Sequence, residues 1–269
     1  MRNGGIFWGI ILVLLGGLFL LETLGILPAN VNVWSVFWPL LLIGLGLSAL
    51  IQAVRPASGR VQALRLPLEG ARAARVKISH GAGELLIDDR AGPDDLLNGS
   101  FGGGVEPHTR RSIDETSVDL RLPSQSLPFF WPPVGSGPHG LNWTVGLNPA
   151  VDYRLDLEVG ASRNRLDLTN LRVVELRLQT GASATEIDFP ARAGRTAAVI
   201  KSGVASVVTR VPQGVGVRIH ATGGLAEINV DTARFPRTGG GDYRSADYDM
   251  AENRLDLEIE AGVGAVKVG

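Results

Sequence analysis

The chain has 269 residues, a formal net charge of −1 and no cysteine. This length holds one large domain or two modest ones. The balanced charge gives no overall field for a nucleic acid partner, and the lack of cysteine excludes disulfides, thiolate metal sites and cysteine nucleophiles. The 35 glycines are typical of a turn-rich β protein.

The first sixty residues predict two membrane-spanning helices. Residues 6–21 are all apolar or glycine, and a second apolar run covers residues 33–54. Each run is long enough to cross a hydrocarbon core of about 30 Å, because a helix rises about 1.5 Å per residue. A cleavable signal peptide is the alternative for the first run, but the second run follows too closely. We therefore predict a transmembrane hairpin over residues 1–55 and a linker over 56–60.

Aromatic and basic residues predict how this hairpin is oriented. Rings near the ends of the spans would anchor at headgroup depth; they are Phe7, Trp8, Trp34, Phe37 and Trp38. The loop between the spans has no Lys or Arg, whereas a basic run follows the second span: Arg55, Arg60, Arg65, Arg72 and Arg75. The positive-inside rule then places the large domain in the cytoplasm, where the basic run can touch anionic headgroups.

From residue 61 onward, the chain repeats one pattern of an alternating strand, a glycine with a small neighbour, and another strand. The glycines of the pattern are Gly81, Gly160, Gly181, Gly203, Gly223 and Gly262. From Gly160 through Gly181 and Gly203 to Gly223 the intervals are 21, 22 and 20 residues. Such a period is typical of stacked rungs that cannot bury their apolar faces alone. We predict one all-β domain over residues 61–269, a β-roll or β-solenoid-like stack of repeats.

The glycines of the pattern are predicted to form corners between short strands. A tight bend favours a residue that tolerates positive φ, and stacked corners leave little room for side chains. The alternative to a corner is a functional one, a phosphate-binding loop. It would need a Lys, Ser or Thr directly afterwards and then a helix. Each copy here runs on into a strand, so we interpret these residues as repeat-corner glycines.

A Pro/Gly-rich stretch over residues 123–140 interrupts the repeat and holds three adjacent aromatic residues, Phe129, Phe130 and Trp131. Three large apolar side chains are costly to leave in water. They either cap the open end of the β roll, with Trp143 packing beside them, or dock on a membrane or a partner helix. We favour the cap.

No residue pattern indicates catalysis or a cofactor. The four histidines are scattered without the spacing of a zinc site. The aspartates near residues 88–95 and 242–249 lack the ligand spacing of a calcium loop. There is no Gly-x-Ser-x-Gly elbow to present a serine nucleophile. We therefore predict a protein that is not an enzyme and assign no catalytic, metal or cofactor-binding residue.

Two segments carry a family resemblance. Gly-x-Phe-Trp-Gly at residues 5–9 and the run from Phe37 to Gly44 resemble the two-helix bacterial membrane module that precedes cell-envelope sensors. The segment from Gly81 to Ile87, followed by Leu97-x-Gly-Ser, resembles the start of the toastrack domain of LiaF-like proteins. The Pro-rich stretch at 123–140 departs from that pattern.

The resemblance implies a bacterial membrane protein of the envelope-stress group, some members of which restrain a two-component histidine kinase. We therefore expect a multi-pass protein of the plasma membrane that acts through protein–protein contacts in envelope-stress signalling. Its partners would be the lipid bilayer, a membrane histidine kinase or other envelope protein, and further copies of itself. The alternatives are a polymerising β-solenoid scaffold beneath the membrane and a lipid- or glycan-binding envelope domain.

Overall fold

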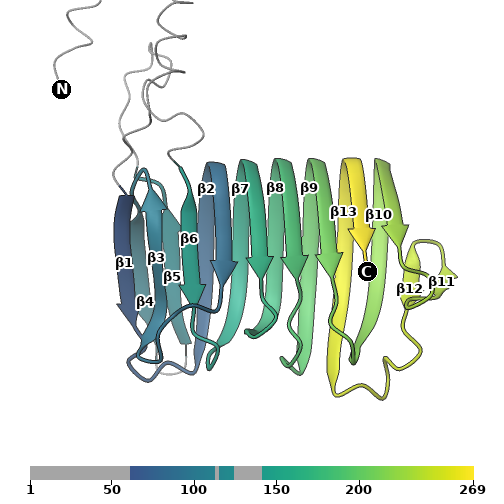
Figure 1. Cartoon of the computed structure of the whole chain (residues 1–269), viewed down its shortest axis with the longest axis horizontal. Coiled ribbons are helices and arrows are strands. Elements are labelled where there is room, and N and C mark those ends of the chain that lie inside the picture. Colours follow the sequence, from purple (N-terminus) through teal and green to yellow (C-terminus); the bar gives the residue numbers. More distant parts are fainter. Residues whose placement is uncertain (1–60, 113–114, 124–140) are drawn as a thin grey trace, which may run out of the picture. The chain divides into compact units, whose positions relative to one another are not determined.

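The computed structural model describes residues 61–112, 115–123 and 141–269. Within these ranges the chain is all β, and thirteen strands join in one sheet (Figure 1). The predicted hairpin over residues 1–55 and the linker over 56–60 lie outside the described residues. The part of the chain that the structure describes contains no helix long and apolar enough to cross a membrane.

Six long strands dominate the sheet, and seven shorter strands lie at its two ends. The long strands are β2 (Ala73–Asp88), β7 (Asp152–Asp167), β8 (Arg172–Asp188), β9 (Arg195–Arg210), β10 (Val215–Val230) and β13 (Asn253–Val268). The short strands are β1 (Val61–Pro67), β3 (Asp95–Gly102), β4 (Glu106–Arg111), β5 (Glu115–Arg121), β6 (Trp143–Leu147), β11 (Arg237–Gly239) and β12 (Asp242–Arg244). We call each long strand a rung and the stack of six the rack.

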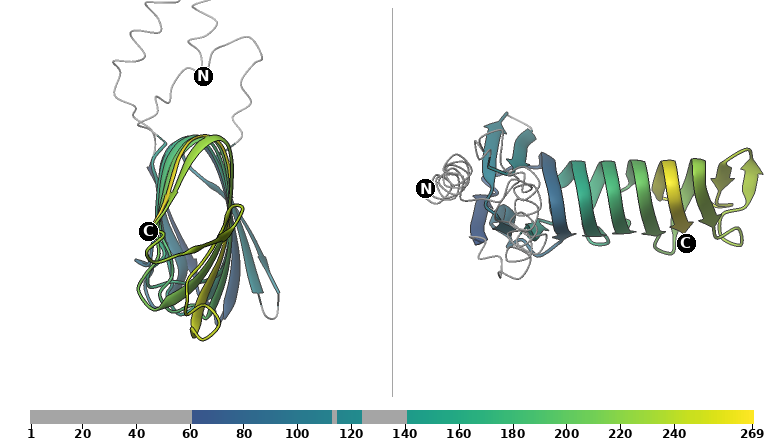
Figure 2. Two further views of the ribbon diagram at one scale, coloured as in Figure 1. Left: turned by 90° about the vertical axis from the view of Figure 1, so that its right-hand side faces the viewer. Right: turned by 90° about the horizontal axis from the view of Figure 1, so that it is seen from above.

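Each rung is an arch made from a single strand. Figure 2 shows the rungs bending over at one edge, so that the two halves of each strand face each other. We call this edge the crest and the opposite, loop-bearing edge the base. In β7 the side chains of Leu155, Leu157 and Val159 point inward before the bend, and Asn164 and Leu166 do so after it. Inward positions are two residues apart in each half but five apart across the bend, so the arch shifts the alternation by one residue.

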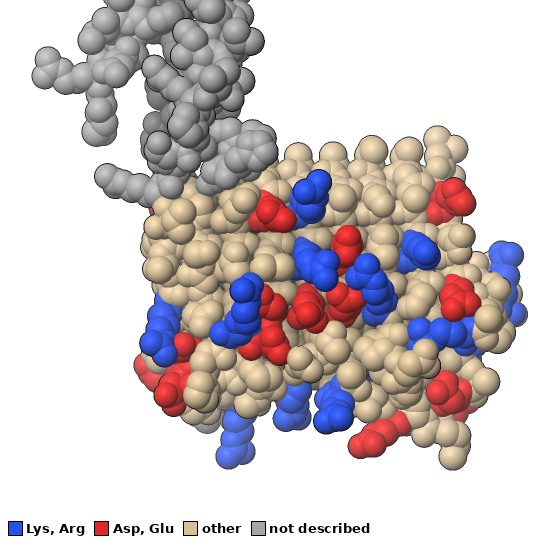
Figure 3. Space-filling model, in the orientation of Figure 1, with Lys and Arg blue, Asp and Glu red and all other residues tan. Residues whose placement is uncertain are grey.

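Outward positions of the rungs carry charged residues of both signs, and Figure 3 shows them interspersed over one face of the rack. Neighbouring rungs place opposite charges side by side. Lys77 on β2 lies 2.7 Å from Glu158 on β7, and Arg210 on β9 lies 3.0 Å from Asp188 on β8. These cross-strand pairs are solvent-exposed, and each contributes only a fraction of a kcal/mol to stability.

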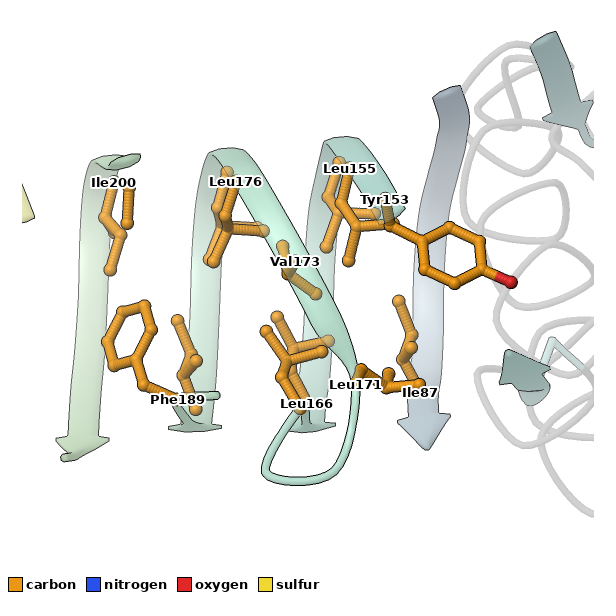
Figure 4. Packing of buried hydrophobic residues seen from close by; sticks show 14 of the residues in the cluster. Ile87, Tyr153, Leu155, Leu166, Leu171, Val173, Leu176, Phe189 and Ile200 are labelled. Atoms are coloured by element: carbon orange, nitrogen blue, oxygen red, sulfur yellow. The ribbon is translucent and has the colours of Figure 1, made fainter. Parts of the chain in front are cut away.

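The core fills the space between the two halves of the arches. Leu155, Leu166, Leu176, Phe189 and Ile200 converge there from successive rungs (Figure 4). The rungs are parallel and in register, with Leu155 beside Leu176 and Leu176 beside Ala198, so like side chains stack in layers. Burial of one such side chain contributes about 1.5–3 kcal/mol, and the repeat multiplies this gain along the rack.

The rungs do not follow the order of the sequence. The order is β2-β7-β8-β9-β13-β10, so the last strand of the chain is inserted between two earlier ones. Leu257 of β13 pairs with Ala198 of β9 on one side and with Ile219 of β10 on the other. Both pairings are parallel. The rung-like pattern predicts that residues 253–268 join the stack, but it does not indicate between which neighbours.

The two ends of the rack are closed by short strands. At one end β1, β3 and β6 extend the second half of β2, while β5 and β4 extend its first half. Phe101 and Trp143 lie fully buried there in edge-to-face contact, with ring centroids 5.0 Å apart. At the other end β12 pairs with the first half of β10, and β11 pairs with β12. Each end therefore covers core surface that a further rung would otherwise bury.

Candidate functional site

A column of glycines runs along the crest and shapes its surface. In the register of the rungs the glycines lie side by side in the order Gly81, Gly160, Gly181, Gly203, Gly262 and Gly224. A Cβ added to Gly160 would lie 2.2 Å from the carbonyl oxygen of Gly81, and one on Gly262 would lie 2.6 Å from that of Gly203. Only glycine fits where the backbone of one rung approaches the next so closely.

Two details of the glycine prediction are wrong. The six column glycines do not have positive φ; the left-handed glycines near the bend are Gly83 and Gly264, with φ of 117° and 129°. At Gly160 and Gly262, close approach of a neighbouring carbonyl, and not turn geometry, is therefore what excludes a side chain. The register also replaces Gly223 by Gly224, since Gly223 pairs with Ala261 and Leu225 with Val263. The two glycines are adjacent in the sequence, and the repeat pattern does not indicate which of them lies in the column.

An open groove of about 1040 Å³ follows the glycine column across all six rungs. Its outward-pointing wall is polar and consists of Ser79, Glu158, Gln179, Lys201, Glu260 and Thr222. Because the column has no side chains, the groove floor is backbone. Its polar groups repeat at the strand spacing of about 4.8 Å. An arrangement of this kind suits an extended polymer or a flat surface better than a compact small molecule.

The charged groups along the groove are already paired with each other. Lys77 Nζ and Ser79 Oγ both donate to the carboxylate of Glu158, at 2.7 and 3.2 Å, and the bond from Lys77 lowers the pKa of that carboxyl. Lys201 Nζ lies 2.9 Å from Glu260, which raises the pKa of the lysine. These shifts stabilise the charged forms. A general base or nucleophile near neutral pH would need the opposite tuning.

The histidines do not form a metal centre in the described part of the chain. His80 is buried beside Trp143, with ring centroids 5.0 Å apart, and burial lowers its pKa to about 4. His220 Nδ1 lies 2.6 Å from Asp242 on the exposed end of the rack, which raises the pKa of the imidazole. His108 is exposed on β4, and His139 lies outside the described residues. Within the described ranges, no three His, Cys, Asp or Glu residues are grouped as metal ligands.

Two of the basic residues predicted to touch headgroups form ion pairs within the domain. Arg65 Nε lies 2.6 Å from Asp95. Arg75 Nε is 3.7 Å from Glu115. Arg65 and Arg75 therefore have carboxylate partners on neighbouring strands. Arg55 and Arg60 lie outside the described residues.

Of the predicted aromatic residues, one lies within the described ranges and the others lie outside them. Trp143 is fully buried, and its indole N–H donates to the carbonyl of Gly102 at 3.1 Å. It closes the end of the core together with Phe101. The remaining predicted aromatic residues lie outside the described residues: Phe129, Phe130, Trp131, Phe7, Trp8, Trp34, Phe37 and Trp38.

An apolar row beside the glycine column is a feature that the sequence reasoning missed. The residue after each column glycine lies in register with its counterparts; the row is Ala82, Ala161, Ala182, Val204, Val263 and Leu225. We call it the crest row. Val204, Val263 and Leu225 are 63%, 45% and 83% exposed. The signal was present in the repeat, since the residue after each column glycine is Ala, Val or Leu.

Comparison with known families now places this architecture. The family model described as the N-terminal domain of toast_rack, DUF2154, matches residues 56–209, which is more than half of the chain. The chain belongs to this family. The LiaI-LiaF-like transmembrane region matches residues 6–50. The prediction of a LiaF-like toastrack protein with an amino-terminal transmembrane region is therefore confirmed, and with it the association with a membrane.

One solved structure supports the fold of the toastrack domain. A candidate cell adhesion protein from Clostridium sporogenes is 20% identical, with a TM-score of 0.70 over 78% of this chain and 99% of its own. A candidate adhesin from Bacteroides fragilis is 8% identical over 79% of this chain and 99% of its own, with a TM-score of 0.32. The first likeness, at such low identity, shows a shared fold and nothing about function. A comparison with curated proteins gave no match.

Proposed function

We propose that this toastrack protein is a non-enzymatic binding protein that takes part in cell-envelope stress signalling from the plasma membrane. One observation carries the proposal: a single chain joins a LiaI-LiaF-like transmembrane region to a toastrack domain. The paired charges along the groove support a binding role, because they leave the carboxylates and amines in forms unsuited to proton transfer.

The partner that we propose is a membrane histidine kinase, contacted through the polar wall of the groove. The rungs hold this wall rigidly, since each outward side chain is spaced by a parallel, in-register sheet. Charges of alternating sign along such a wall favour one docking register over others. The wall therefore provides specificity without a deep pocket.

Exchange of the charges on the wall tests this proposal. The double variant Lys201→Glu with Glu260→Lys keeps the 2.9 Å pair but swaps its ends. We expect thermal stability close to that of the unchanged protein and an altered response of a kinase-dependent reporter to a cell-wall antibiotic. The matched control is Arg172→Asp with Asp152→Arg, an exposed pair at the base of the rungs. Equal reporter output from both swaps and the unchanged chain would contradict docking at the wall.

We also propose that the β domain lies in the cytoplasm. The support is the basic run after residue 54 and its absence from the loop between the spans. An alkaline phosphatase fused after Gly269 should be inactive, and a green fluorescent protein at the same position should be fluorescent. The reverse pattern would place the domain outside and remove a cytoplasmic kinase surface as the partner.

A further inference from the structure

The crest is the one long edge of the rack where charge is missing over three neighbouring columns. The glycine column, the crest row and the column after it contain only Gly, Ala, Val, Leu and Ser in the register of the six rungs. Figure 3 shows this upper edge free of charged side chains, while the face below it carries many. The crest row becomes more apolar along the rack, from Ala82 to the exposed Leu225.

The base of the same rungs has the opposite character. Arg195, Arg172 and Asp152, at the starts of their strands, are paired or exposed there. Met250, in the turn before β13, is 90% exposed among charged neighbours at this edge. The rack is therefore amphipathic from crest to base. Charged residues flank the three uncharged columns of the crest, so an apolar contact confined to these columns desolvates no charge.

The described chain enters the domain at the crest. Gln62 pairs with Phe101, Phe101 with Trp143, and Trp143 with Leu85, so the start of β1 lies level with the bend of β2. Between the end of the matched transmembrane region at residue 50 and Val61 there are ten residues. Even fully extended, such a segment reaches only about 36 Å. The edge at which this segment joins the domain is therefore the uncharged one.

We propose that the crest row rests on the lipid bilayer, with Leu225, Val263 and Val204 immersed at the boundary between headgroups and acyl chains. Shallow burial of apolar side chains at this depth is favourable when no charge has to follow them. A second copy of the chain or a partner protein could also cover an apolar row. The tether argues for lipid, because it joins the transmembrane region to the domain at this edge. The inference does not depend on the signalling proposal.

The absence of cysteine from the chain gives a direct test. Single variants Leu225→Cys and Met250→Cys in the full-length protein are labelled with the fluorophore NBD and placed in nanodiscs of phosphatidylcholine and phosphatidylglycerol. Both positions are more than four-fifths exposed, so neither label disturbs the core. Met250 is the matched control because it lies at the base of the same end of the rack.

We expect the Leu225 probe to show blue-shifted emission and to lose most of its fluorescence to a nitroxide lipid labelled near the headgroup. The Met250 probe should keep its fluorescence with that lipid and be quenched by aqueous iodide. Equal behaviour of the two probes would overturn the proposal. A Leu225 probe shielded from iodide but not quenched by the nitroxide lipid would also overturn it, because a protein surface would then cover the crest.

Discussion

In the middle of the rack, β7, β8 and β9 repeat one pattern, whereas the ends close with strands that repeat nothing. The middle rungs bury medium-sized aliphatic residues such as Leu157, Leu178 and Ile200 in stacked layers. Large aromatic residues are buried at both ends, Phe101 and Trp143 at one and Phe235 at the other, while Tyr153 and Phe189 are their aromatic counterparts in the middle. A middle rung packs between two other rungs of the same pattern. An end has a rung on one side only, so other side chains must cover the core that would otherwise be exposed there.

This difference shows that the repeat specifies contacts between neighbours and leaves termination to separate sequence. It also explains the place of β13. The pattern of β13 is interchangeable with that of any rung, so nothing in it fixes an order. The connection over residues 231–252 carries β11 and β12 across the end of the rack and returns the chain between β9 and β10.

The largest effect is expected at an end. Trp143→Ala removes the largest buried side chain and the donor to Gly102, and should lower the free energy of unfolding by about 3–5 kcal/mol. Trp143→Phe keeps a ring and should lose less. Chemical denaturation monitored by far-UV circular dichroism measures both. If Trp143→Ala cost no more than a surface change, the aromatic end would not be closing the core.

A smaller loss of stability, caused by a single added methyl group, is expected in the middle, at the glycine column. Gly160→Ala places a Cβ 2.2 Å from the carbonyl oxygen of Gly81, and the two rungs must move apart. Such overpacking costs about 1–3 kcal/mol. Gly239→Ala is the control, because nothing lies within 4 Å of the added Cβ and φ there is not positive. Equal stability of the two variants would contradict the steric role of the column.

Much of the middle could be predicted from the sequence, because alternation and period are properties of neighbouring residues. The rungs, the inward residues such as Leu155 and Leu166, and the crest position of Gly181 follow from them. The reason for the glycines was mistaken in part. Backbone spacing between rungs is a tertiary quantity, and only the structure shows that a neighbouring carbonyl occupies the space.

The ends and the crest could not be derived in the same way. The sequence assigned the end cap to Phe129, Phe130 and Trp131, with Trp143 packing beside them. The first three lie outside the described residues, while Trp143 closes the described core together with Phe101. Phe101 and Trp143 are 42 residues apart and meet only because β6 pairs with β3. The crest row was missed for a related reason. Its members look unremarkable singly, and only the register brings Val204, Val263 and Leu225 together.

Next in size is a pH effect at the boundary between an end and the middle. His80 occupies a position where the other rungs have Val159, Thr180, Ser202, Ala261 and Gly223. Burial lowers its pKa to about 4 in the folded protein, from an ordinary value of 6.5. The unfolded chain therefore binds more protons between these values, and stability falls as the pH drops below about 6.5.

Between pH 7 and pH 5 this group should remove about 2 kcal/mol of stability, since each pKa unit corresponds to about 1.4 kcal/mol. His80→Phe should flatten the profile over that interval, and a His108→Phe variant should leave the loss in place because His108 is exposed on β4. Urea denaturation at the two pH values measures the difference. An unchanged slope in His80→Phe would mean that His80 can be protonated inside the fold.

The smallest effect is expected from the polar ladder that joins the end rung to the middle. Lys77 on β2 donates to Glu158 on β7 at 2.7 Å, but both side chains are about one-third or more exposed to solvent. Solvent screens such a pair, so Lys77→Met should lower the free energy of unfolding by only about 0.2–1 kcal/mol. The loss should shrink further in 1 M salt, where the Debye length is about 3 Å. A loss as large as that of Trp143→Ala would mean that the ladder, and not the core, holds the rungs together.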